Sequence, residues 1–199
     1  FLDQLRRLGL RIVAVSARYP GLCHSVLGNE PQALEAVVEH LGGLGHRRFG
    51  WLGGNAGLGR HESRLQAFET ALSRAGLALD PRYTIRLKEA DRIDGADAAR
   101  MALAHARRRD FPTAFVAYNT LMAAGAVREF DRAGWPVPAR VSVASADLSP
   151  LAAASTPRIT AAGTDPEKLG EAAARLVLER GGLAFCRLAV TRSGNSSHQ

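Results

Sequence analysis

The sequence has few cysteines and no long hydrophobic run. Its 199 residues include only two cysteines, Cys23 and Cys186, which lie far apart and fit no metal-binding or redox motif. This usage is typical of reduced thiols in the cytosol rather than of a disulfide scaffold. No stretch approaches about 18 apolar residues without a charge, which excludes a spanning helix. With 46% hydrophobic and 23% charged residues, we expect a globular cytoplasmic protein without a membrane partner.

The residue patterns of common enzyme and metal sites are also missing. There is no Gly-x-Ser-x-Gly element, and neither cysteine lies in a catalytic motif. The six histidines form no His-x-x-x-His pair. Asp91, Asp94 and Asp97 lack the remaining ligands of a calcium loop, and capping of a helix by Asp94 or Asp97 is the simpler interpretation. We therefore expect no enzymatic activity, no metal and no cofactor.

The net charge of +7 raises the question of nucleic-acid binding. The arginines are scattered, and the one dense run, 107–109, ends an expected helix, where the helix dipole already favours cations. No helix-turn-helix, zinc-finger or RNA-binding motif is present. A solvated helix end is therefore favoured over a nucleic-acid patch.

Short apolar runs alternate with amphipathic helical segments along the chain. Strands are expected at 12–15, 48–52, 84–87, 113–117, 141–144 and 188–190. Helices are expected from a cap at Asn29 to Gly45, over 62–74 and 97–108, after a cap at Thr120, and from 165 to 181–182. This order predicts an α/β fold with parallel sheets flanked by helices. Such sheets bind ligands at the carboxyl ends of their strands, here after residues 15, 52, 117 and 144.

A glycine-rich loop, 53–60, lies between an expected strand and an expected helix. Backbone N–H groups at the start of a helix can hold a phosphate. The loop lacks both the Gly-Lys-Ser/Thr ending and the Gly-x-Gly-x-x-Gly spacing of phosphate-binding motifs. A flexible connection between two lobes is the favoured interpretation, and a phosphate cradle is the alternative.

Five segments, in order, carry motifs of a known protein family. Residues 40–54 read HLGGLGHRRFGWLGG, and residues 64–77 read RLQAFETALSRAGL. They resemble the motifs HLxxxGHRRIxx(I/L)xG and RLxGFxxALxxAGL of the LacI/GalR family of transcription regulators. Residues 112–126, PTAFVAYNTLMAAGA, resemble PTAVFxxNDxMAxGA. The later matches are 133–143, similar to AGxxVPxDVSV, and 157–170 with the terminal VTRS. Together they cover nearly the whole chain.

The resemblance implies a periplasmic-binding-protein-like type I fold with two Rossmann-like lobes and a small effector, a sugar or related metabolite, between them. One lobe, incomplete at its start, would comprise residues 1–54 and 151–182, and the other residues 55–150 and 183–199. The crossovers are expected near Gly54, 147–150 and Gly182. The resemblance further implies a homodimer that binds DNA through an N-terminal head not present in this chain.

The resemblance also nominates effector-binding residues. Arg64, Asn119 and Asp147 match polar contacts, and their guanidinium, amide and carboxylate groups suit a ligand with many hydroxyls. Phe68 matches an aromatic residue near the pocket that would stack on a sugar. From the pattern alone, Arg64 could instead be a surface residue, Phe68 plain core and Asp147 a turn former.

Three positions depart from the family pattern. The Asn-Asp pair of the family reads Asn119-Thr120, its aspartate before the first helix reads Asn29, and its Gly-Phe-Asp-Asp turn reads SADL at 145–148. Asn29 and Thr120 therefore stay in the expected site without the usual carboxylates. These losses predict an effector with fewer hydroxyls than a hexose, or one with a negative charge that Arg64 holds.

Two other functional classes remain as alternatives. A solute-binding protein of a sugar transporter shares the fold, although the GHRR, VSV and VTRS segments favour the regulator. An enzyme on the same scaffold is least supported, because the sequence contains no recognisable nucleophile–base pair or metal-ligand set.

Overall fold

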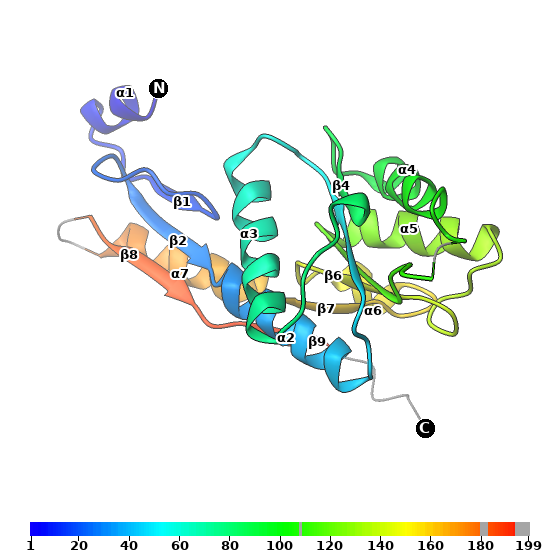
Figure 1. Cartoon of the computed structure of the whole chain (residues 1–199). Helices are drawn as coiled ribbons and strands as arrows, with labels where there is room; N and C mark the ends of the chain where they lie inside the picture. Colours follow the sequence, from blue (N-terminus) through cyan, green and yellow to red (C-terminus); the bar gives the residue numbers. More distant parts are fainter. Residues whose placement is uncertain (108, 180–182, 194–199) are drawn as a thin grey trace. The chain divides into compact units, whose positions relative to one another are not determined.

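The computed structural model describes residues 1–107, 109–179 and 183–193, which form two compact units (Figure 1). Unit 1 consists of residues 1–29 and 163–191. Unit 2 consists of residues 30–162 together with the segment from residue 192. Each unit contains parallel strands packed with helices, so the predicted α/β class with parallel sheets is confirmed.

Unit 2 is built on a six-stranded sheet with the order β4-β3-β5-β6-β7-β9. Hydrogen bonds pair β3 with β4 and β5, β5 with β6, and β6 with β7, all in parallel. The strands are β3 (Phe49–Gly53), β4 (Thr84–Arg86), β5 (Ala114–Ala117), β6 (Ser142–Ser145), β7 (Thr160–Gly163) and β9 (Thr191–Ser193).

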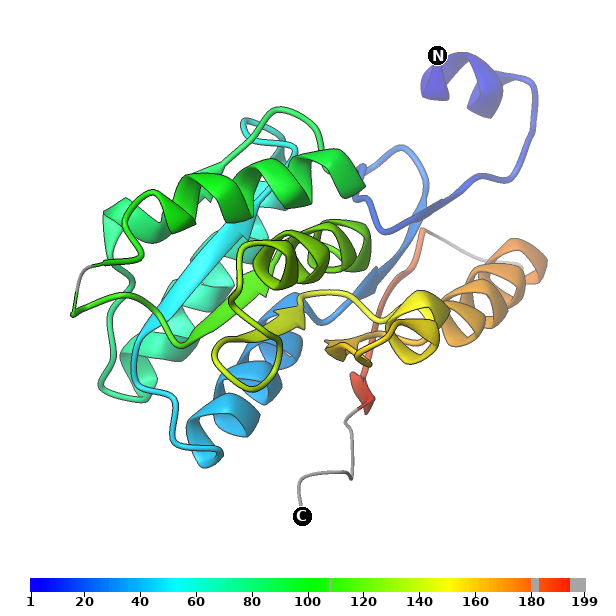
Figure 2. The same ribbon diagram turned by 90° about the vertical axis from the view of Figure 1, so that its right-hand side faces the viewer.

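Two pairs of helices cover the two faces of this sheet (Figure 2). One pair is α2 (Glu30–Gly43) with α3 (Gly59–Arg74), and the other is α4 (Arg92–Leu103) with α5 (Thr120–Arg132). The shorter elements are η1 (Pro81–Tyr83) and α6 (Pro150–Ala154). Because both faces are covered, every residue of β3 and β5 is buried, as continuous apolar runs predict for parallel strands.

Aromatic side chains fill much of the core of unit 2. The ring centroids of Trp51 and Phe68 lie 5.4 Å apart, and those of Phe115 and Phe130 lie 5.2 Å apart. All four side chains are fully buried. The sheet is thus held rigidly beneath the loops at the carboxyl ends of its strands, because close-packed interiors deform little.

Glycine residues allow the helices α4 and α5 to pack closely against each other. A methyl group at Gly95 would overlap the backbone of Met122, and one at Gly125 would overlap the carbonyl oxygen of Arg92. Buried alanines on α4, such as Ala98, continue the same narrow contact. Small side chains therefore set the distance between these two helices.

Unit 1 contains a three-stranded sheet of order β1-β2-β8, with bounds Val13–Val15, His24–Gly28 and Phe185–Leu188. Helix α7 (Pro166–Leu178) packs on β1 and β2, and α1 (Leu2–Arg7) precedes them. Asp165 caps α7 by accepting a 2.9 Å hydrogen bond from the N–H of Glu167. At the other end of α7, Nη1 of Arg11 donates to the carbonyl of Val177 at 2.9 Å. Both cysteines belong to this unit and are free.

Several element boundaries differ from those predicted. The structure adds α1, β2, η1, α6, β7 and β9, and the strand expected at 188–190 lies at Phe185–Leu188. Helix α4 begins at Arg92 rather than 97, because Asp91 caps it and Asp94 completes the capping box. The cap of α5 is Asn119, not Thr120. The expected end of α7 at 181–182 lies outside the described residues.

The division between the units also differs from the expected lobes. The chain passes between units at 29/30, 162/163 and 191/192, rather than near residues 54, 150 and 182. The glycine-rich loop 53–60 lies inside unit 2, where the N–H groups of Asn55 and Ala56 donate to the carbonyls of Glu89 and Leu87. These bonds tie the loop to the segment after β4, so it does not connect the two units.

No helix among the described residues combines the length and the apolar character that a membrane span requires. This agrees with the absence of long apolar runs from the sequence.

Candidate functional site

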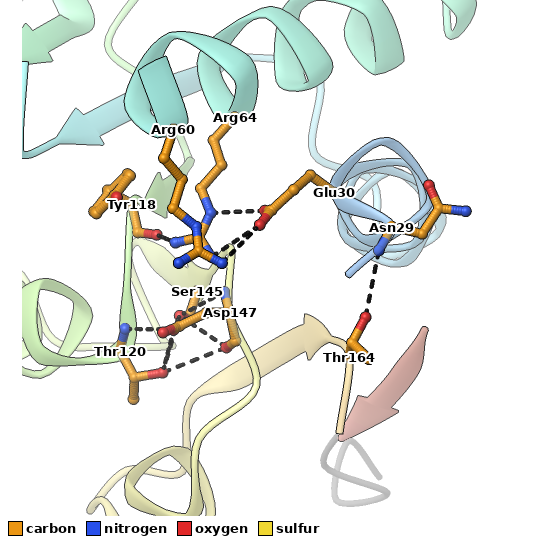
Figure 3. Close-up of polar contacts among 9 residues, drawn as sticks. All are labelled: Asn29, Glu30, Arg60, Arg64, Tyr118, Thr120, Ser145, Asp147 and Thr164. Atoms are coloured by element: carbon orange, nitrogen blue, oxygen red, sulfur yellow. Dashed lines mark hydrogen bonds and ion pairs between the residues drawn. The ribbon is translucent and has the colours of Figure 1, made fainter. Parts of the chain in front are cut away.

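Polar groups from four segments of unit 2 meet beyond the carboxyl ends of β5 and β6 (Figure 3). We call them the polar cluster; its members are Glu30, Arg60, Arg64, Tyr118, Thr120, Ser145 and Asp147. Three segments supply most of it: the first turns of α3, the residues just after β5, and the end of β6 with its following turn. Because ligands of parallel sheets bind at this edge, the polar cluster is the candidate site.

Asp147 organises one half of the polar cluster. Its Oδ1 atom accepts hydrogen bonds from the backbone N–H of Thr120, from the hydroxyl of Thr120 and from the hydroxyl of Ser145, each at 2.7 Å. Thr120 is the first residue of α5, so the carboxylate also lies at the positive end of that helix dipole. These contacts hold Asp147 in a fixed orientation as an acceptor.

Arg64 organises the other half. Its Nε donates to Oε2 of Glu30 at 2.7 Å, its Nη2 to Oε1 of Glu30 at 3.3 Å, and its Nη1 to the Tyr118 carbonyl at 2.6 Å. The guanidinium also lies over the Tyr118 ring, 4.8 Å from its centroid. Arg60 joins the group through a 3.4 Å contact between its Nη2 and Oε1 of Glu30.

The charge of Arg64 is stabilised although the side chain is buried. Burial lowers the pKa of Arg64, but the attraction and hydrogen bonds of Glu30 outweigh it, and Asp147 and Tyr118 act in the same direction. The net result is a raised pKa, so Arg64 is a permanent cation. Arg64 is thus electrostatically coupled to Asp147 as well as bonded to Glu30.

A buried histidine holds the first turns of α3 in place through hydrogen bonds. His61 is fully buried, its Nε2 accepts from Nε1 of Trp51 at 3.4 Å, and its Nδ1 contacts Oε1 of Glu62 at 3.1 Å. The hydrogen bond with His61 lowers the pKa of Glu62, and the N–H of Gly57 and the ion pair with Arg86 lower it further. This network fixes the turn of α3 that presents Arg60 and Arg64.

The structure brings three of the six nominated residues together: Arg64, Thr120 and Asp147. Phe68 lies in the core against Trp51 with no exposed surface, so it contacts aromatic neighbours rather than an open pocket. Asn119 lies next to the cluster, where its Oδ1 accepts from the N–H of Met122 and its Nδ2 donates to the Ala90 carbonyl, both at 2.8 Å.

The sixth nominated residue, Asn29, belongs to unit 1. Its backbone N–H donates to Oγ1 of Thr164 at 3.3 Å. A side chain at the neighbouring Gly28 would collide with the same hydroxyl, so this part of unit 1 is packed closely around Thr164. Asn29 immediately precedes α2, in agreement with the expected start of that helix.

Sequence reasoning missed Glu30, Ser145 and the carbonyl of Tyr118 as members of the cluster. Glu30 directly follows Asn29 and starts α2, where acidic residues are common because of the helix dipole. That local explanation gives no sign of a pairing with Arg64. The only sign in the sequence was that each of the three lies within two residues of a nominated residue.

The polar cluster combines donors and acceptors with a balanced charge. Arg60 and Arg64 carry positive charge, and Glu30 and Asp147 carry negative charge. Hydroxyl groups of Thr120 and Ser145 add further hydrogen-bonding capacity. Among the described residues, no group of three or more His, Cys, Asp or Glu side chains is arranged to hold a metal ion. The cluster can therefore both donate and accept hydrogen bonds.

This fold, two units of parallel α/β structure with polar groups at the strand ends, defines a class of binding proteins. Comparison with known sequences agrees, because residues 38–183 match the periplasmic binding protein-like domain family. The chain belongs to this family, and the curated relatives to which it is similar are HTH-type transcription regulators.

Two curated relatives are transcription regulators. The HTH-type transcriptional repressor PurR of Photobacterium profundum is 27% identical over 159 residues, which cover 80% of this chain and 46% of that protein. The HTH-type transcriptional regulator GalR of Escherichia coli is 34% identical over 124 residues, which cover 62% of this chain and 35% of that protein. The chain spans about half the length of the PurR relatives it matches.

A solved structure shows the same fold. A LacI family transcriptional regulator from Enterococcus faecium, determined with bound ribose, superposes with a TM-score of 0.82. The similarity covers 96% of this chain and 72% of that one, at 20% sequence identity. The relatives named here are regulators rather than enzymes.

Proposed function

We propose that this chain senses a small polar metabolite, a sugar or a related compound, and that the polar cluster belongs to the effector site. The convergence of Arg64 and Asp147 at the carboxyl ends of β5 and β6 carries the proposal. A carboxylate accepts hydroxyl hydrogens, and a guanidinium donates to ring and hydroxyl oxygens. Thr120 and Ser145 align the carboxylate for this role through three 2.7 Å hydrogen bonds.

In the proposed mechanism, units 1 and 2 correspond to the two lobes that the family resemblance implies. An effector shifts the balance between two conformations only by binding one of them more tightly. A regulator of this kind would pass that shift to a DNA-binding head through a homodimer in the cytoplasm. The names of the curated relatives, all HTH-type regulators, support this assignment for the whole protein.

Isothermal titration calorimetry tests the proposal. The wild-type chain is titrated with neutral sugars, sugar phosphates, organic acids and purines, and we expect at least one compound to bind. Arg64→Ala should weaken that binding by about 1.5–3 kcal/mol, because a hydrogen bond from a charged group is lost. Asp147→Asn, which retains the size of the side chain, should weaken it in the same direction.

Arg74→Ala is the matched control, because Arg74 lies at the other end of α3 and pairs with Glu35. It should leave the affinity unchanged. Circular dichroism verifies that each variant is folded. An affinity that Arg64→Ala and Asp147→Asn both leave unaltered would remove the polar cluster from the effector site.

A further inference from the structure

Glu30 forms a two-pronged ion pair within the polar cluster. Its two carboxylate oxygens accept from Nε and Nη2 of Arg64, at 2.7 and 3.3 Å, and Arg60 contacts Oε1 from the open side at 3.4 Å. The side chain of Glu30 is 20% exposed and that of Arg64 only 8%. Two parallel N–H···O contacts in a mostly buried place make a specific pair, unlike a loose surface contact.

This pair limits what Arg64 can bind. Glu30 occupies the edge formed by Nε and Nη2 of the guanidinium, and the Tyr118 carbonyl accepts from Nη1, so an anion would have to displace Glu30 to bind the Nε–Nη2 edge. Displacement would leave the largely buried carboxylate of Glu30 with only the 3.4 Å contact of Arg60, which is unfavourable. A neutral ligand can use the remaining N–H donors without breaking the pair.

The charge of the whole cluster leads to the same conclusion. Without Glu30, two arginines would face the single carboxylate of Asp147, and the site would attract anions. With Glu30, two positive and two negative charges balance. One of the two alternatives from the sequence was an anionic effector, because the sequence counted Asp147 as the one remaining carboxylate and left Arg64 available for an effector's charge.

We propose that Glu30 determines the charge specificity of the effector site. With Glu30 in place, the site selects an uncharged, hydroxyl-bearing metabolite and rejects the phosphorylated form of the same compound. Removing the charge of Glu30 frees Arg64 and turns the preference toward anions. This inference rests on the proposed effector function of the polar cluster.

Calorimetric titration of matched ligand pairs tests the role of Glu30. The probes are ribose with ribose 5-phosphate, glucose with glucose 6-phosphate, and galactose with galactose 1-phosphate. For at least one pair, the wild type should bind the neutral sugar more tightly than its phosphate. Glu30→Gln, which keeps the shape of the side chain, should shift the ratio of the two dissociation constants toward the phosphate by about tenfold or more.

Glu35→Gln provides a closely matched control. Glu35 also lies on α2 and pairs with an arginine of α3, Arg74, but outside the polar cluster. The substitution therefore makes the same change in net charge and removes the same kind of bridge between the two helices. Its ratio of dissociation constants should equal that of the wild type.

The outcomes separate this inference from the function on which it rests. The role of Glu30 is refuted if Glu30→Gln and the wild type have the same ratio of dissociation constants for sugar and phosphate. It is also refuted if Glu35→Gln shifts that ratio as much as Glu30→Gln does. In both cases the proposed effector site is unaffected. Tighter binding of a phosphate than of its parent sugar by the wild type refutes the inference even if Glu30→Gln does not fold. Binding of no probe to any variant, in this and the wider panel, overturns the proposed function and the inference together.

Discussion

Replacing Gly125 with alanine tests how closely α4 and α5 pack. The added methyl group would overlap the carbonyl oxygen of Arg92 and lie 2.9 Å from the carbonyl carbon of that residue and 3.1 Å from the nitrogen of Ala96. All of these atoms belong to the backbone of α4. No change of rotamer relieves the collision, so the two helices must move apart.

The expected loss of stability is the difference between two effects. Alanine is favoured over glycine inside a helix by about 1 kcal/mol. Overpacking of a core costs about 1–3 kcal/mol, and rigid backbone atoms place Gly125→Ala near the upper end of that range. The free energy of unfolding should therefore fall by about 2 kcal/mol, which corresponds to a decrease in Tm of about 4–8 °C for a chain of this size.

Urea unfolding followed by tryptophan fluorescence measures this loss directly. The two tryptophans of the chain, Trp51 and Trp135, both lie in unit 2, as do α4 and α5. Gly42→Ala on α2 is the control, because a methyl group there meets no atom within 4 Å. It should leave the stability unchanged or raise it by up to about 1 kcal/mol. A Gly125→Ala variant as stable as the wild type would refute the close packing of the two helices.

Further substitutions at three positions test local features of unit 2. Burial, and then the charge of His40, lowers the pKa of His46 below 6.5, so the folded state resists protonation and the wild type loses stability as pH falls from 6.5. His46→Gln should flatten this loss in urea titrations between pH 6.5 and about 5, and an unchanged slope would contradict the assignment. Asn119→Ala removes the cap of α5 and should lower the free energy of unfolding by about 1–2 kcal/mol; no change in the urea midpoint would exclude the capping role. Thr120→Asp restores the acidic residue of the family but places a second carboxylate beside Oδ1 of Asp147, where the hydroxyl now donates at 2.7 Å, and should cost about 1–3 kcal/mol. Thr120→Ser keeps the hydroxyl and should cost less than Thr120→Asp in the same measurement.

The strands that the sequence predicted well are those whose burial is complete. β3 and β5 are buried along their whole length, so their apolar runs were visible without knowledge of the fold. β2 begins with the polar residues His24 and Ser25, and three of the four residues of β7 are alanine or glycine, which are depleted in strands. These two segments become strands because neighbouring strands offer them hydrogen bonds, a tertiary effect that no local pattern contains.

The observed starts of α4 and α5 differ from the predicted ones because several neighbouring residues are able to cap each helix. Asp91, Asp94 and Asp97 are all able to cap a helix, and so are Asn119 and Thr120. In α5, the hydroxyl and N–H of Thr120 both donate to Asp147, and Asn119 accepts from the N–H of Met122 as the cap. In α4, Asp91 and Asp94 form the capping box through local contacts. Residue type alone does not choose between such neighbouring candidates.

The composition of the polar cluster also could not be predicted fully from the sequence. Family likeness placed Arg64, Thr120 and Asp147 in one site, because motif positions report which strand ends and helix starts face each other. The same likeness counted acidic groups only at the motif positions, and it missed Glu30, which lies one residue beyond Asn29. The pairing of Glu30 with Arg64 depends on the packing of α2 against α3, and residues 34 apart reveal nothing of that contact in sequence. One carboxylate changes the cluster from cationic to neutral. The proposed role of Glu30 therefore favours an uncharged effector over the anionic one, which was one of the two alternatives that the sequence left open.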